Sequence, residues 1–311
     1  MDNLERQKII NYFNYNITLE HSAIIQYLFH AYTLGDEAGI EDDLEEIARE
    51  EMKHLRMFAH KVVELGGEPA ISDRAAVFLH APTPSELLNL DVEAEKMAIE
   101  EYSKQYDDLK DESAKRILER VVNDENSHHH LFLELKEKLT EKDINGEPSP
   151  LDENRVKIVQ MLNQTLERQY KLILENLYQS FITRHKNPYL SDELEQKAID
   201  KMKHYGWVAE EVAEMGGEPE VKLPEIDKVK DEKIIIQKNL EEEKESPKVY
   251  EKLAKEVEDP DLQWILKRIQ KREIHYTDLA KFLEKPDIPA EDVARVISTL
   301  TVGSLFRKKD K

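Results

Sequence analysis

Six side chains in the first half of the chain have the types and spacing of ligands for a pair of metal ions. They are Glu20, Glu51, His54, Glu95, Glu125 and His128. Two Glu-x-x-His pairs are among them, Glu51/His54 and Glu125/His128, and residues three apart project from the same face of a helix. Carboxylate oxygen and imidazole nitrogen together suit iron, manganese or zinc. We therefore predict a site for two divalent cations.

Apolar residues recur at spacings of three and four around each ligand, which is the pattern of amphipathic helices. One such stripe runs from Phe13 through Ile17, Glu20 and Ile24 to Ala31. The pattern predicts four helices near residues 3–35, 41–65, 83–110 and 112–140. Four carboxylates facing one core would destabilise it unless cations balanced their charge. We expect a four-helix bundle in which each helix brings its ligands to a common interior.

The chain also repeats itself after about 150 residues. Met52-Lys53-His54 recurs as Met202-Lys203-His204, and Thr18-Leu19-Glu20 recurs as Thr165-Leu166-Glu167. The break falls in the turn-rich stretch 145–150. Helices of the second copy are expected near residues 152–185, 191–215, 225–257 and 260–284. The expected domains are an intact bundle at 1–145, a degenerate bundle at 151–284 and a linker with a tail at 285–311.

The second copy has an incomplete ligand set. Its corresponding residues are Glu167, Lys201, His204, Glu243, Glu273 and Tyr276. Lys201 replaces a bridging glutamate and Tyr276 replaces the second histidine. A lysine ammonium can balance the buried acids in place of a metal. We therefore predict about two metal ions per chain, with a structural second bundle.

Four segments of the first copy resemble bacterioferritin, a member of the ferritin-like superfamily that also includes rubrerythrin. They are Leu19–Tyr27, Glu51–His54, Asp91–Glu95 and Asp124–His128. The resemblance implies an all-α fold of two tandem ferritin-like bundles and a di-iron centre. It implies that Glu20 and Glu95 are terminal ligands, that Glu51 and Glu125 are bridging ligands, and that His54 and His128 complete the two shells. It further implies a place for Tyr27 beside the metals, and the alternative for Tyr27 is a core aromatic whose hydroxyl is hydrogen-bonded.

Met52 lies where bacterioferritins bind haem between two subunits, and Met202 repeats it. A methionine that fills a gap in a core explains the same residue. The packing role is the expected one, and haem is expected to be absent.

The end of the chain resembles the peptide that docks cargo proteins inside encapsulin shells. Its core is Leu300, Thr301, Val302, Gly303, Ser304 and Leu305. Alternating apolar side chains could enter a groove on the shell, where Gly303 and Ser304 permit close backbone approach. The resemblance implies an encapsulin shell protein as partner.

Composition narrows the class further. The net charge of −21 disfavours nucleic acid as a partner and suits the attraction of small cations. The absence of cysteine excludes disulfides, iron–sulfur clusters and a rubredoxin-type site. The first residues have no apolar run that could be a signal peptide or membrane span, so we expect a cytoplasmic location, within a shell.

The combined expectation is an encapsulated ferroxidase that oxidises Fe(II) with oxygen or peroxide for iron storage and detoxification. It would hold two iron ions, with manganese also compatible, and could form homo-oligomers. Two alternatives use the same ligands: a peroxidase or manganese-catalase-like enzyme, and a non-catalytic bundle stabilised by metal.

Overall fold

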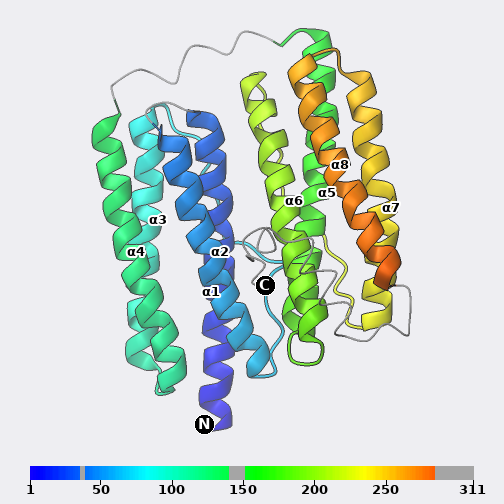
Figure 1. The fold of residues 1–311 in the computed structure, drawn as a ribbon. Helices are drawn as coiled ribbons and strands as arrows, with labels where there is room; N and C mark the ends of the chain where they lie inside the picture. Colours follow the sequence, from blue (N-terminus) through cyan, green and yellow to red (C-terminus); the bar gives the residue numbers. More distant parts are fainter. Residues whose placement is uncertain (36–38, 140–150, 284–311) are drawn as a thin grey trace, which may run out of the picture. The chain divides into compact units, whose positions relative to one another are not determined.

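The computed structural model describes residues 1–35, 39–139 and 151–283, without the side chains of residues 275–283. These residues form eight helices and no strand, which confirms the all-α prediction (Figure 1). The helices are α1 (Asn3–Leu34), α2 (Ile40–Glu64), α3 (Pro84–Asp108), α4 (Glu112–Lys138), α5 (Glu153–Thr183), α6 (Pro188–Glu214), α7 (Glu232–Glu256) and α8 (Pro260–Leu283).

Local sequence explains where the helices begin. The Asp2, Asp111 and Asp152 side chains each accept a hydrogen bond from a backbone N–H in the first turn of α1, α4 and α5. The Thr83 side chain caps α3 in the same way, and Pro84 follows it at a position where proline costs no hydrogen bond.

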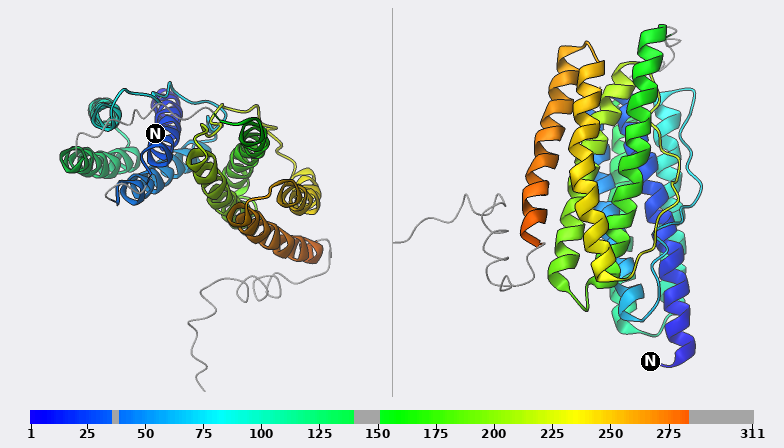
Figure 2. Two further views of the ribbon diagram at one scale, coloured as in Figure 1. Left: turned by 90° about the horizontal axis from the view of Figure 1, so that it is seen from above. Right: turned by 90° about the vertical axis from the view of Figure 1, so that its right-hand side faces the viewer.

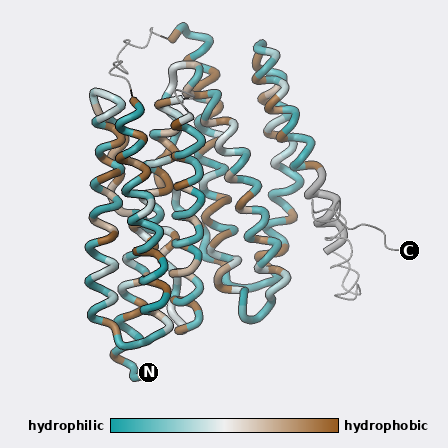
Figure 3. The backbone as a smooth tube through the Cα atoms, turned by 60° about the vertical axis from the view of Figure 1, so that its left-hand side comes forward, coloured by the Kyte–Doolittle hydropathy of each residue, from teal (hydrophilic) through white to brown (hydrophobic). Residues whose placement is uncertain are grey.

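The first four helices form a bundle in which α1 pairs with α2 and α3 with α4 (Figures 1 and 2). Contacts of α1 with α3 and of α2 with α4 close it. Hydrophobic positions recur along every helix (Figure 3). Phe13 and Phe58 pack on one side of the bundle's centre and Tyr27 and Phe132 on the other, each pair with ring centroids 4.9 Å apart. The bundle therefore has two apolar layers with the predicted ligands between them.

Equivalent contacts fix the register of the repeat. The Asn14 amide donates to the Glu68 carbonyl and accepts from the Ala70 N–H, and Asn163 does the same with Glu218 and Glu220. Asn163 is thus the counterpart of Asn14. In this register Gln169, rather than Glu167, is the counterpart of Glu20. The Thr-Leu-Glu match was two residues out of register, and that shift turns a side chain about 200° around a helix.

Two compact units divide the chain at a different place from the repeat. The first is Met1–Lys230, with α1 to α6, and the second is Asp231–Lys311, with α7 and α8. Within the first unit, α6 contacts α1 and α5 contacts α2. The Arg56 guanidinium donates to Glu195 across this interface, with 2.6 Å between Nη1 and Oε1. Helices α5 and α6 of the second copy therefore pack against α1 and α2 of the first.

Candidate metal centre

The six predicted ligands meet in the interior of the first bundle. Glu20 comes from α1, Glu51 and His54 from α2, Glu95 from α3, and Glu125 and His128 from α4. Their side chains are buried, with His128 the most exposed residue at 7%. Burying so many ionisable groups together costs free energy, and interactions within the cluster must offset that cost.

The ligands fall into two overlapping groups, each able to surround one ion. The first is Glu20, Glu51, His54 and Glu125, and the second is Glu51, Glu95, Glu125 and His128. Within a group, one ligand atom from each residue lies within 4.8 Å of the others. Glu51 and Glu125 belong to both groups. The geometry thus provides two ion positions, two shared carboxylates and one terminal carboxylate for each ion.

Both imidazoles direct Nδ1 at the shared carboxylates. The His54 Nδ1 atom lies 2.9 Å from Glu51 Oε2 and 3.2 Å from Glu125 Oε1. The His128 Nδ1 atom lies 2.8 Å from Glu51 Oε1 and 3.1 Å from Glu125 Oε2. Nδ1 is therefore the atom that each ring directs into the centre of the cluster. Asp124 orients His54 from behind, with 3.2 Å between Nε2 and Oδ2.

Two tyrosines hold the terminal carboxylates. The Tyr27 hydroxyl donates to Glu95 Oε1 at 2.7 Å, and the Tyr102 hydroxyl donates to Glu20 Oε1 at 2.5 Å. The sequence indicated Tyr27 alone. The missed signal was its spacing, because each tyrosine lies seven residues, or two helical turns, after the glutamate of its own helix.

The electrostatics of the cluster favour bound protons when no cation is present. Burial, and then the Glu125 and Glu51 carboxylates, raise the pKa of Glu20 and of Glu95. Burial lowers the pKa of His128, but its contacts with the Glu125 and Glu51 carboxylates outweigh burial and raise that pKa to about 9. The pKa of His54 is also raised, since Glu51 and Glu125 outweigh its burial. Cations placed here would displace those protons.

The donor set fits two iron ions. Within the described residues, Oε1 of Glu51 and Oε1 of Glu125 are buried and accept no hydrogen bond of acceptable geometry. These oxygens have lone pairs available in the centre of the cluster. Carboxylate and imidazole donors suit Fe(II), and the four carboxylates match the charge of two divalent ions.

The second copy differs from the prediction at Glu167. That side chain is exposed on α5, while Gln169 is fully buried. Both amide atoms of Gln169 are without a hydrogen-bond partner among the described residues. Lys201 and His204 on α6 are buried, as are Glu243 and Glu273 in the second unit. With Gln169, Lys201 and Tyr276, half of the six ligand positions are replaced.

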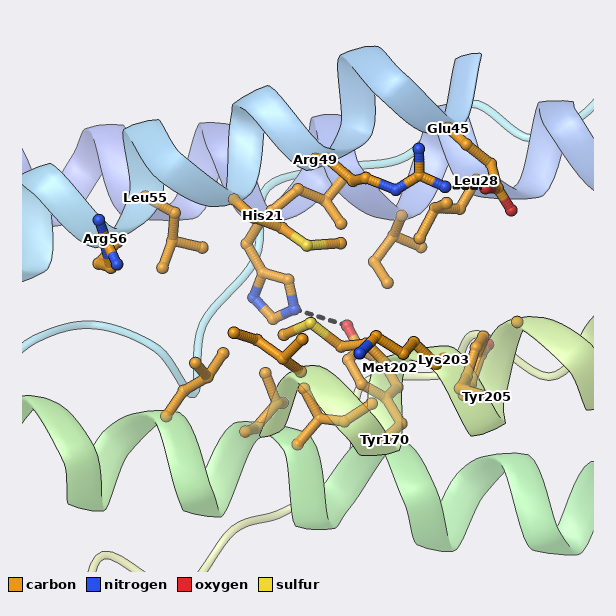
Figure 4. Close-up of a pocket in the computed structure, with 18 of the residues that line it drawn as sticks. His21, Leu28, Glu45, Arg49, Leu55, Arg56, Tyr170, Met202, Lys203 and Tyr205 are labelled. Carbon is orange, nitrogen blue, oxygen red and sulfur yellow. Dashed lines mark hydrogen bonds and ion pairs between the residues drawn. The ribbon is translucent and has the colours of Figure 1, made fainter. Parts of the chain in front are cut away.

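A cavity of about 550 Å³ lies between α1–α2 and α5–α6 (Figure 4). Apolar side chains dominate its lining, among them Ile24, Leu28, Met52, Ile173, Leu177 and Met202. His21 and Tyr170 point toward one another across it (Figure 4). Met52 and Met202 therefore line one cavity, as the repeat of this methionine in the two copies suggested.

The targeting residues Leu300–Leu305 lie outside the described residues. Within the part of the chain that is described, no helix combines the length and apolarity needed to cross a membrane.

Comparison with known proteins matches both copies to related families. The ferritin-like family profile matches residues 13–138, and the rubrerythrin profile matches residues 174–283. A bacterioferritin of Desulfovibrio desulfuricans is 30% identical over 128 residues, which cover 40% of this chain and 71% of that protein. An X-ray structure of the Desulfovibrio desulfuricans bacterioferritin, which describes its diiron site in different catalytic states, is 27% identical with a TM-score of 0.41. That match covers 44% of this chain and 84% of the other.

Proposed function

Because this chain belongs to the ferritin-like family of di-iron carboxylate proteins, we propose that its first bundle is a ferroxidase. The observation that carries the proposal is the pair of overlapping ligand groups joined by Glu51 and Glu125. Fe(II) is the substrate at both positions. Each ferrous ion gives up one electron, and oxygen or peroxide takes up the electrons. Two electrons and two protons convert oxygen to hydrogen peroxide. Two electrons and two protons likewise convert hydrogen peroxide to two water molecules.

The protein's own groups bind and orient the ions. Glu51 and Glu125 hold both ions at one spacing, while Tyr27 and Tyr102 fix the carboxylates of Glu95 and Glu20. Ferric product would then leave for a mineral store. This role fits the chain's net charge of −21, which attracts ferrous ions toward the protein.

An anaerobic ferrous titration followed by oxygen tests the proposal. We expect a break near two ferrous ions per chain and oxidation faster than in protein-free buffer. Glu51→Ala should abolish the fast phase, and Glu46→Ala, an exposed change on the same helix, should leave it intact. Parent-like oxidation by Glu51→Ala would refute a ferroxidase at this site.

The same ligands also serve a peroxidase or a manganese-catalase-like enzyme. Elemental analysis with peroxide turnover separates these activities, because a catalase releases oxygen and needs no reductant. A purely structural role predicts tightly held, redox-silent metal and loss of stability, without loss of turnover, on chelation.

We also propose that the chain acts inside an encapsulin shell, on the sequence of residues 300–305. Co-expression with an encapsulin shell protein from the same genome tests this. The full chain should co-purify with assembled shells, and a chain ending at residue 299 should not. Equal recovery of both would refute the tail as the docking element.

Haem is a second binding candidate because Met52 and Met202 line the same cavity. Met52 and Met202 would hold the haem iron through their thioether sulfurs. Reconstitution with haem should give a Soret band that Met52→Leu weakens. If the parent chain and Met52→Leu gave identical spectra, haem would not be bound through Met52, and the methionines would be packing residues.

A further inference from the structure

Buried polar side chains form cross-links between α1 and α3 at four levels along the bundle. In order along α1 they are Asn16–Gln105, Glu20–Tyr102, Tyr27–Glu95 and His30–Asp91. From Asn16 to His30 the residue number on α1 rises by 14, and from Gln105 to Asp91 it falls by 14 on α3, so the cross-links keep one antiparallel register. The inner two hold terminal metal ligands. In the described part of the chain, the outer two make no hydrogen bond to a predicted ligand.

The outer cross-link at one end is a pair of amides. The Asn16 Nδ2 atom donates to Gln105 Oε1, and Gln105 Nε2 donates to Asn16 Oδ1, both at 2.8 Å. Both residues are at most 1% exposed. This pair lies about one helical turn from Glu20 on α1 and from Tyr102 on α3.

The outer cross-link at the other end combines an imidazole with a carboxylate. The His30 Nδ1 atom lies 2.8 Å from both oxygens of Asp91, and both residues are fully buried. Gln26 also donates to Asp91, at 2.9 Å. His30 Nε2 is hydrogen-bonded to the Phe78 carbonyl, and the Phe78 N–H donates to the Gln26 amide oxygen. These two bonds attach the segment before α3 to α1. His30 lies about one turn from Tyr27, and Asp91 about one turn from Glu95.

We propose that the two outer cross-links are separate positioning devices, each for one of the two metal ions. Asn16–Gln105 would set the Glu20 end, and so the ion held with His54. His30–Asp91 would set the Glu95 end, and so the ion held with His128. This inference rests on the proposed di-metal site. Apolar packing alone tolerates small sliding of one helix along another, whereas a buried hydrogen bond fixes the distance that ligand placement requires.

The second copy supports this assignment. Thr165 and Leu253 stand at the positions of Asn16 and Gln105. Gln179 and Asn239 stand at the positions of His30 and Asp91. The copy that replaced half of its metal ligands has therefore changed both outer cross-links, and it still forms its helices. The amide pair is therefore missing from the sequence of the copy that replaced half of its metal ligands, while at the other end two amide side chains replace the imidazole and the carboxylate.

Matched variants can test each end. Asp91→Leu keeps the branched shape and removes every hydrogen bond, while Asp91→Asn can still accept from Gln26 and donate to a neutral His30. At the other end, Asn16→Leu with Gln105→Met replaces both partners by apolar groups, which limits the cost to folding. The readouts are a cobalt(II) titration and the positions of anomalous scattering in crystals of the cobalt-loaded chain.

We expect two tight sites in the parent chain and in Asp91→Asn. Asp91→Leu should weaken only the position beside Glu95 and His128, by about 10- to 100-fold. The Asn16→Leu/Gln105→Met chain should weaken only the position beside Glu20 and His54. Parent-like binding at both sites, equal loss at both, or loss in Asp91→Asn would overturn the proposal. If Asp91→Leu does not fold, the double variant decides. A parent that binds no metal would instead refute the proposed function.

Discussion

His21 and Tyr170 occupy equivalent positions in the two copies and are hydrogen-bonded to each other, with 2.6 Å between Nε2 and Oη. Two identical copies would bring two identical side chains together here. In this chain the partners are complementary. His21 Nδ1 lies 3.0 Å from the Asp73 carbonyl, which can only accept. Nδ1 therefore carries the proton, and Nε2 of the neutral ring accepts from the Tyr170 hydroxyl.

The metal-free protein should lose stability in acid because of His21. Burial lowers the pKa of His21 to about 4, below the value of 6.5 that an exposed histidine has. Between these values the unfolded chain binds the proton more tightly, so folding weakens as the pH falls from 6.5 to 4. The loss is on the order of 3 kcal/mol, and none is added below pH 4. Urea unfolding at a series of pH values measures it.

His21→Gln is the control for this prediction, since glutamine does not titrate. Burial also lowers the pKa of His60 to about 4, and His60 is present in both chains. The difference between parent and variant isolates His21. Equal slopes from pH 4 to 6.5 would contradict a buried neutral imidazole.

Metal binding should release protons near neutral pH. The pKa values of Glu20, Glu95, His54 and His128 are all raised in the metal-free cluster. Two divalent ions should displace about four protons, and apparent affinity should rise with pH. Calorimetry in buffers of different ionisation enthalpy counts them. In Glu20→Gln the count should fall by about one, and a release near zero in the parent would show that the cluster binds metal fully deprotonated.

Restoring a second metal centre should require three substitutions. Lys201→Glu with Tyr276→His leaves Gln169, a neutral amide, at the counterpart of Glu20. We expect this double variant to bind no more metal than the parent. Adding Gln169→Glu should raise the content from about two toward four ions per chain, as measured by elemental analysis. A gain already in the double variant would show that the register assigned to α5 is unimportant for binding.

A methyl group at Gly67 should destabilise the first bundle. A Cβ there would lie 2.9 Å from side-chain carbons of Ile10 and of Val62. We expect Gly67→Ala to cost about 1–3 kcal/mol in unfolding free energy. Gly206→Ala is the matched control, because its Cβ would meet nothing closer than 3.4 Å and alanine favours the helix. Similar losses in both would argue against crowding as the cause.

The metal site of the first copy could be predicted from sequence because there are few ways to compensate the charge of its buried carboxylates. Four acids on apolar stripes must be compensated, and two Glu-x-x-His pairs indicate how. The register of α5 was wrong because a three-residue match outweighed the apolar pattern around Leu162 and Leu166, which fixes the buried face. The cavity and the α1–α3 cross-links were missed because they depend on which faces of distant helices meet, and one sequence does not specify that.

Because the cavity lies between two copies within one chain, its two walls need not obey twofold symmetry. In a homodimer, a single codon change alters both sides of a twofold contact. Here Arg49 on one wall corresponds to Ile199 on the other, and Arg56 corresponds to Gly206. Each wall can therefore mutate by itself, and an unsymmetrical guest can be selected in one orientation.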